Sequence, residues 1–436
     1  MRYIFTFLLL IVSGYSIAQI KKEANTSSYL DIHHSYLEEA FILTKNCVGF
    51  SAPISGRAYG YLAVGMYESS VPITGLKSLE GQLNEFQPSR VLVDSSELNW
   101  GLVLNESNYQ IMLYLYRGMP PSNRERLDQL HDSIYKQQAR RTRRKVRLKS
   151  IQYARAIAKD IIDWSKKDGG DEGYRNNFPE DFEPEECQSC WEKTFPGYLS
   201  ALVPYWGENR PMLTSSLSEI ENMQVFPYST DSSSVMFQEA MNVYENSKDS
   251  DPELEIIAEY WDDGAGRSGT PSGHFFKLAQ HVVEQEHLEL EKALELYVKL
   301  GIAVNDAFIG SFRLKYKFNF IRPITYIHRY IDPRFNSRLT NPPFPEYPSG
   351  HSFQSGAASE VMKSIFGDVL TFTDSTNFSR TDIDGTPRTY DSFTEMSEEI
   401  SISRFYGGIH FLRTLNESLT YGRKIGEFVA TELQCR

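Results

Sequence analysis

Apolar side chains recur at intervals of three and four residues along most of the chain, a spacing that places them on one face of an α-helix. One clear stripe runs from Phe353 through Ala357 and Val361 to Ile365. Similar patterns cover residues 30–46, 58–69, 107–139, 146–165, 232–247, 275–318 and 409–433. Strict alternation of apolar and polar residues, which is typical of strands, is scarce. The sequence therefore predicts an all-α fold.

Changes in periodicity and composition divide the chain into four segments. Residues 1–18 resemble a signal peptide, with a basic start, an apolar core and the small-x-small sequence Ser16-Ile17-Ala18. Residues 19–166 form a predicted N-terminal helical part, residues 167–231 an irregular insert, and residues 232–436 a C-terminal helical bundle. We therefore expect an exported protein, periplasmic or secreted.

The charge of the chain limits its classes of partner. A net charge of −12 over 436 residues argues against nucleic-acid binding, which needs clustered Lys and Arg. A small anionic ligand is still compatible, because one pocket can be basic on an acidic protein. After residue 20 no apolar run approaches about 18 residues, so we expect no integral membrane span.

The chain has four cysteines, Cys47, Cys187, Cys190 and Cys435, which an exported protein can oxidise. Cys187-x-x-Cys190 lies in the irregular insert. It is compatible with a local disulfide, with free thiols or with half of a zinc site. No second pair of Cys or His lies nearby in sequence to complete a zinc site.

The segment from Phe344 to His351 has the chemistry of an anion site. Its prolines keep the approach extended, and Ser349 can cap the helix predicted from Phe353 onward. Gly350 and His351 then lie in the first turn, where free N–H groups and the helix dipole attract anions. A hydroxyl, a bare backbone N–H and an imidazole would all face one oxyanion.

Two basic residues precede this segment. Lys315 and Arg322 are seven residues apart, which corresponds to two helical turns. We therefore expect them on one face of a helix that Pro323 ends or bends. Two long cationic side chains on one face can converge on a single anion.

A basic residue and a histidine follow the segment. Arg404 and His410 lie on either side of Gly407-Gly408, where we expect a break in the helix. Such a break would let both side chains aim at one point. Three cations, a hydroxyl, a backbone N–H and two imidazoles suit a shared oxyanion site.

The sequence Pro-Ser-Gly-His occurs a second time, at residues 271–274. This copy opens a predicted helix after a Gly-rich turn. It lacks the order of basic residues that surrounds residues 348–351. We interpret it as structural.

These segments make the chain resemble the vanadium-dependent haloperoxidases and their relatives in the type 2 phosphatidic acid phosphatase superfamily. Lys-x6-Arg-Pro at 315–323, Pro-Ser-Gly-His at 348–351 and Ser-Arg-x5-His at 403–410 match the signature of that superfamily. The resemblance implies helical bundles with the cofactor near the end of one bundle. It also implies that hydrogen peroxide oxidises halide on bound vanadate, for halogenation of an organic acceptor.

The resemblance also assigns roles to individual residues. His410 would be the metal ligand that anchors vanadate (V5+), and His351 would be the acid–base group. The vanadate oxygens would contact Lys315, Arg322, Ser349, the Gly350 N–H and Arg404. Asp306 matches a family acid that forms a salt bridge to Arg404.

Phosphate and vanadate have nearly the same shape and charge, so the same residues are compatible with an acid phosphatase that needs no cofactor. His410 would attack the phosphorus of a phosphomonoester, and His351 would protonate the leaving oxygen. Phosphatase-type members carry an Asp that orients the catalytic His where this chain has Thr414, which disfavours phosphatase turnover. A non-enzymatic oxyanion-binding protein is a third interpretation. Phe344 matches chloroperoxidase-like members, and ordinary packing beside Pro345 is the alternative.

Overall fold

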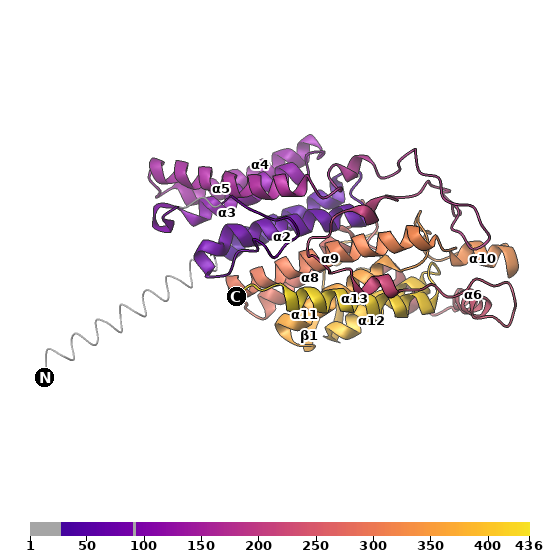
Figure 1. The fold of residues 1–436 in the computed structure, drawn as a ribbon. Helices are drawn as coiled ribbons and strands as arrows, with labels where there is room; N and C mark the ends of the chain where they lie inside the picture. Colours follow the sequence, from indigo (N-terminus) through magenta and orange to yellow (C-terminus); the bar gives the residue numbers. More distant parts are fainter. Residues whose placement is uncertain (1–27, 90–92) are drawn as a thin grey trace.

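The structure, a computed structural model, describes residues 28–89 and 93–436 and is mainly helical (Figure 1). The predicted signal peptide lies outside the described residues. After a helix over residues 28–46, the α-helices are α2 (Ala52–Thr74), α3 (Trp100–Leu115), α4 (Pro121–Ala139), α5 (Arg144–Ser165), α6 (Val235–Asn246), α7 (Pro252–Tyr260), α8 (Thr270–Gln285), α9 (Leu290–Phe318), α10 (Pro323–Tyr330), α11 (Gly350–Phe366), α12 (Phe393–Tyr406) and α13 (Leu412–Glu432). None of the described helices combines the length and apolar character that a membrane crossing requires. The predicted all-α fold class is confirmed.

One small sheet interrupts the helical pattern. β1 (Val369–Asp374) pairs antiparallel with β2 (Arg388–Ser392) in the stretch between the helical patterns predicted at residues 353–365 and 409–433. Phe372 is buried opposite Tyr390. The alternation of buried and exposed residues in β1 is short and lies among polar residues. The sequence pattern therefore does not predict this strand.

The helices form two packed groups. α3 packs against α4 and α5, and these helices lie together at the top of Figure 1. α2 lies between this group and α9, which packs with α11 and α13 in the lower group. Most buried apolar side chains of both groups belong to one main cluster, so the two predicted helical parts share a core.

Glycines bring α11 and α13 into close contact. A Cβ at Gly356 would lie 2.6 Å from the carbonyl oxygen of Leu419. A Cβ at Gly422 would overlap the backbone of Phe353. This close approach fixes the start of α11, which carries the Pro-Ser-Gly-His segment, relative to the start of α13, which follows His410.

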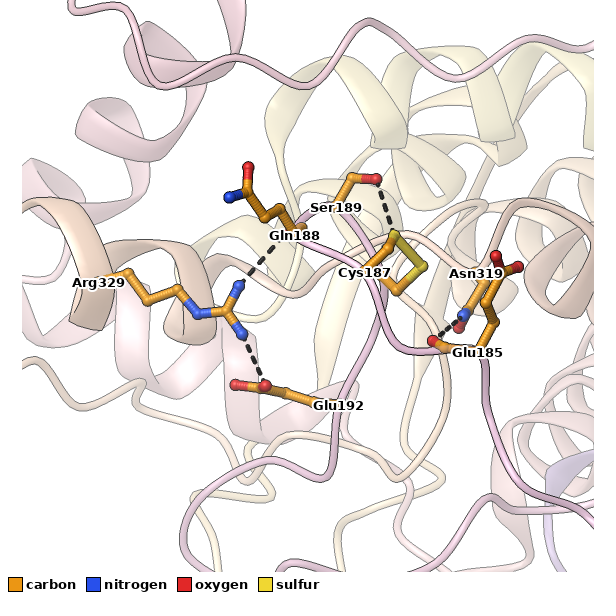
Figure 2. The surroundings of a disulfide bond; sticks show 8 residues. Glu185, Cys187, Gln188, Ser189, Glu192, Asn319 and Arg329 are labelled. Atoms are coloured by element: carbon orange, nitrogen blue, oxygen red, sulfur yellow. Dashed lines mark hydrogen bonds and ion pairs between the residues drawn. A yellow bond between two sulfur atoms is a disulfide. The ribbon is translucent and has the colours of Figure 1, made fainter.

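The irregular insert contains short 3-10 turns and the local disulfide Cys187–Cys190 (Figure 2). Cys47 and Cys435 are buried free thiols. The disulfide loop docks on the strand-like stretch before Arg322: the Trp191 N–H donates to the Asn319 carbonyl (2.8 Å) and the Ile321 N–H to the Ser189 carbonyl (2.9 Å). The insert therefore holds a segment that leads directly into the predicted oxyanion site.

Candidate active site

The structure gathers seven predicted residues into one group, here called the oxyanion cradle: Lys315, Arg322, Ser349, Gly350, His351, Arg404 and His410. Ser349 is the N-cap of α11, as predicted, and its hydroxyl oxygen accepts the Ser352 N–H (3.3 Å). The Ser349 N–H donates to the Ser418 hydroxyl on α13 (2.9 Å). The helix start is thus anchored on its neighbour.

Lys315 and Arg322 reach the cradle from two elements. α9 ends because Asn319 adopts a left-handed conformation (φ 45°), and Arg322 is the extended residue before α10. The predicted shared helix face is therefore wrong. Lys315 Nζ donates to the carbonyls of Pro345 (2.9 Å) and Glu346 (3.1 Å), which turns the lysine toward the signature segment.

Phe344 lies against both of these cations. Its ring centre is 4.7 Å from Lys315 Nζ and 5.1 Å from the Arg322 guanidinium carbon. Its carbonyl also accepts a hydrogen bond from Arg322 Nε (3.0 Å). Phe344 therefore does more than pack beside a proline, because an aromatic face stabilises and orients buried cations.

Arg404 and His410 are separated by the break expected at the glycine pair. α12 ends at Tyr406, Gly408 has a positive φ (75°), and His410 precedes α13. Arg404 Nη1 donates to the Trp261 carbonyl (3.1 Å), and Nη2 lies 3.1 Å from Asp262 Oδ1. The acid that pairs with Arg404 is thus Asp262.

Asp306 does not form the predicted salt bridge to Arg404. It accepts the backbone N–H groups of Met212 (2.8 Å) and Leu213 (3.1 Å) and the Ser216 hydroxyl (2.7 Å), and burial raises its pKa to about 6. Nine residues separate Asp306 from Lys315 on α9, so at 3.6 residues per turn the two lie on opposite faces. Asp306 therefore fastens the insert to α9, behind the cradle.

Glu346 is a second residue that sequence reasoning missed. Its Oε1 lies 2.8 Å from His410 Nδ1 and accepts the Phe411 N–H (3.1 Å), and its Oε2 accepts the Thr414 hydroxyl (2.9 Å). Burial raises the pKa of Glu346 to about 7, against the opposing effect of Arg322 and Lys315. Its acidic side chain among apolar and proline residues was a signal, but no spacing rule connects it to His410.

Burial and mutual repulsion destabilise the positive charges of the cradle. Burial, together with Arg322, lowers the pKa of Lys315. Burial and Arg404 lower the pKa of Arg322 to about 10, although Glu346 opposes this. Burial and nearby cations also lower the pKa values of His351 and His410, so both imidazoles are neutral near pH 7. A bound anion would relieve this repulsion.

The polar groups of the cradle fit a tetrahedral oxyanion such as vanadate. Arg322 Nη2, Arg404 Nε and His351 Nε2 are buried, and none has a hydrogen-bond partner among the described residues. A Cβ at Gly350 would meet no atom nearer than 4.0 Å, so the space beside its backbone is free for a ligand. Unpaired buried polar groups are costly, so their convergence indicates a site made for a polar ligand.

His274 of the second Pro-Ser-Gly-His sequence lies in a different environment. Its Nδ1 is 2.7 Å from Asp263 Oδ2, and its Nε2 is 2.7 Å from Asp374 Oδ2. These carboxylates outweigh the effect of burial and raise its pKa to about 10. With both nitrogens occupied, His274 fits the structural role that the sequence predicted.

Comparison with known proteins gives a family model and solved structures. Residues 295–435 match the family model described as the VCPO second helical-bundle domain. A structure described as the first bacterial vanadium-dependent iodoperoxidase is 28% identical, with a TM-score of 0.83, over 94% of this chain and 97% of that one. A holo-type bacterial vanadium-dependent chloroperoxidase is 14% identical, with a TM-score of 0.65, over 88% of this chain and 93% of that one. At this identity the likeness concerns the fold alone. No curated protein sequence matches the chain.

Proposed function

Because the chain belongs to the vanadium-dependent haloperoxidase family, we propose that it oxidises halide with hydrogen peroxide when vanadate occupies the oxyanion cradle. One observation carries the proposal: three unpaired buried polar atoms, on Arg322, His351 and Arg404, converge beside the open backbone of Gly350. The cradle therefore offers charge, hydrogen bonds and an imidazole to a single oxyanion.

Each cradle residue has a proposed part in holding vanadate. His410 Nε2 would be the metal ligand, and Lys315, Arg322 and Arg404 would balance the anionic charge. The Ser349 hydroxyl and the Gly350 N–H would donate hydrogen bonds from the start of α11. Bound vanadate supplies a Lewis acid that activates peroxide toward halide.

His351 is the proposed proton acceptor. The backbone at Trp261 and Asp262 hydrogen-bonds to its ring, and its Nε2 has no partner among the described residues. Because burial and Arg404 lower its pKa, this nitrogen is unprotonated near neutral pH and can accept a proton from an entering peroxide. Asp262 positions Arg404 beside it.

The test is halide oxidation by vanadate-loaded protein. We expect triiodide from iodide and peroxide, because the more similar solved structure is described as an iodoperoxidase. Bromination of a phenol dye tests bromide in parallel. Phosphate should inhibit by competing for the cradle. Bound vanadate without any halide oxidation would reject the proposal, and phosphomonoester hydrolysis by metal-free protein would favour the phosphatase.

We propose that the organic acceptor binds in a cavity of about 840 Å³ that adjoins the segment leading to the cradle. Pro343 lines the cavity, and the next residue, Phe344, contacts Lys315 and Arg322. The lining contains apolar side chains, including Phe178 and Leu199, and its charged members are cations, Lys45 and Arg175. This lining suits a small aromatic acid.

A Lys45→Glu variant tests this cavity. We expect the KM for 4-hydroxybenzoate to rise roughly fivefold, because reversing an exposed charge near the ligand is worth about 1 kcal/mol. Iodide oxidation and the KM for neutral 4-hydroxybenzyl alcohol should not change. Lys145→Glu, at the start of α5, makes the same charge change and is the control. An unchanged KM in Lys45→Glu would show that acceptors react outside the cavity.

We also propose that the chain is exported. The signal-like residues 1–18 support this, and the Cys187–Cys190 disulfide suits an oxidising compartment. The mass of the mature protein should correspond to a chain that begins at Gln19. A mature chain that keeps Met1 would contradict export by cleavage.

A further inference from the structure

We infer that Glu346 is the positioning residue for His410 and replaces the carboxylate that phosphatase-type relatives carry at the position of Thr414. The inference deepens the proposed function and takes from it only the identity of the anion, vanadate. It also gives Thr414 a different role from the one that the sequence indicates. His410 still has a carboxylate partner, which is Glu346 from another segment, and the Thr414 hydroxyl holds that carboxylate in place.

The contacts of His410 define which nitrogen carries its proton. Arg322 Nη1 lies 3.2 Å from His410 Nε2, and a guanidinium can only donate hydrogen bonds. Nε2 is therefore the acceptor. The proton of the neutral ring must lie on Nδ1, which donates to Glu346 Oε1 at 2.8 Å. This tautomer places the Nε2 lone pair inside the cradle, where it accepts from Arg322 Nη1 and where bound vanadate would replace that contact.

Glu346 can fix the imidazole because it is itself held at many points. The Phe411 N–H binds one carboxylate oxygen and the Thr414 hydroxyl binds the other. The backbone N–H of Glu346 donates to the Phe320 carbonyl (2.9 Å), and its own carbonyl accepts from Lys315 Nζ (3.1 Å). Its side chain is fully buried. Its position therefore sets the orientation of the His410 ring.

When it is ionised, Glu346 adds a negative charge to this geometric effect. A carboxylate that accepts the second N–H of a metal-binding histidine makes the free nitrogen a stronger donor, and its loss costs roughly 10–100-fold in metal affinity. Although His410 precedes α13, Thr414 lies close to it, because the Thr414 hydroxyl and His410 Nδ1 contact the two oxygens of the same carboxylate. A carboxylate placed there could therefore reach the same nitrogen.

The experiment measures vanadate affinity by 51V NMR and difference absorbance, without turnover. Glu346→Gln keeps the shape and removes the charge, and we expect vanadate to bind roughly 10–100-fold more weakly. Glu346→Gln combined with Thr414→Asp should recover most of the lost affinity. Thr414→Val is the control, because it removes one hydrogen bond and leaves the carboxylate. We expect this variant to lose less than about fivefold in vanadate affinity.

Three results would overturn the inference. The first is a folded Glu346→Gln protein that binds vanadate within about twofold of wild type, and the second is a double variant with no recovery of affinity. The third comes from the wild-type protein alone, which keeps the test open if a variant does not fold: 15N NMR that places the His410 proton on Nε2 instead of Nδ1. Because neither measurement needs halide oxidation, they remain decisive if the proposed activity is absent.

Discussion

A His410→Ala variant is expected to lose vanadate binding by more than about 100-fold and to oxidise no halide. Loss of a partner that only orients a ligand already costs roughly 10–100-fold, so loss of the ligand itself should cost more. The fold should survive, because Glu346 keeps the Phe411 N–H and the Thr414 hydroxyl, and Arg322 Nη1 keeps the Ile409 carbonyl.

Phosphate separates the ligand role of His410 from its contribution to charge. Phosphate binding to the metal-free protein needs the cations and the α11 start, which His410→Ala leaves in place. We therefore expect phosphate affinity to change less than tenfold, so that the preference for vanadate disappears. His287→Asn is the control, since His287 is exposed with a positive φ (51°) that Asn tolerates. Undiminished vanadate binding in His410→Ala would indicate that His351, and not His410, is the vanadate ligand.

The sequence predicted those parts of the site that follow from local chemistry. Ser349 caps α11 because a short hydroxyl before an apolar stripe satisfies free N–H groups. The break after α12 follows from the Gly407-Gly408 pair. The all-α class follows from helical periodicity over most of the chain. Each of these inferences uses residues that are close together in sequence.

The predictions that the structure contradicts concern contacts between segments that are distant in sequence or separated by a helix end. Seven-residue spacing placed Lys315 and Arg322 on one helix, but Asn319 ends that helix in the left-handed conformation that Asn tolerates. Spacing could not show whether Asp306 or Asp262 faces Arg404, because both precede it by about a hundred residues or more. Only tertiary packing brings Asp262 to Arg404 and Glu346 to His410.

His274→Ala is expected to destabilise the folded protein by about 3–5 kcal/mol at pH 7. The substitution leaves Asp263 and Asp374 buried without the imidazolium between them, and breaking a buried ion pair by removing one partner has costs of this size. Asp374 keeps the Tyr260 hydroxyl (2.9 Å), which compensates only in part. Urea unfolding of the variant, beside wild type and His287→Asn, measures the difference.

The way this stability difference changes with pH tests whether His274 is charged in the ion pair. Because the pKa of His274 is about 10 in the folded protein and about 6.5 when unfolded, its stabilisation is complete below about pH 6.5 and disappears as the pH rises through about 10. The difference in unfolding free energy between wild type and His274→Ala should therefore shrink from pH 7 to pH 10. A difference that stays constant would mean that His274 is neutral and that the loss comes from packing.

The same variant tests how the second Pro-Ser-Gly-His sequence supports the cradle. The Trp261 ring stacks on His274, with ring centres 4.7 Å apart, and the Trp261 carbonyl accepts a hydrogen bond from Arg404. A loosened Trp261 would release one of the contacts that orient the Arg404 guanidinium. We therefore expect His274→Ala to weaken vanadate binding, measured in the absence of urea, although His274 has no free nitrogen to offer the anion. Unchanged vanadate affinity in a destabilised variant would show that Asp262 alone positions Arg404.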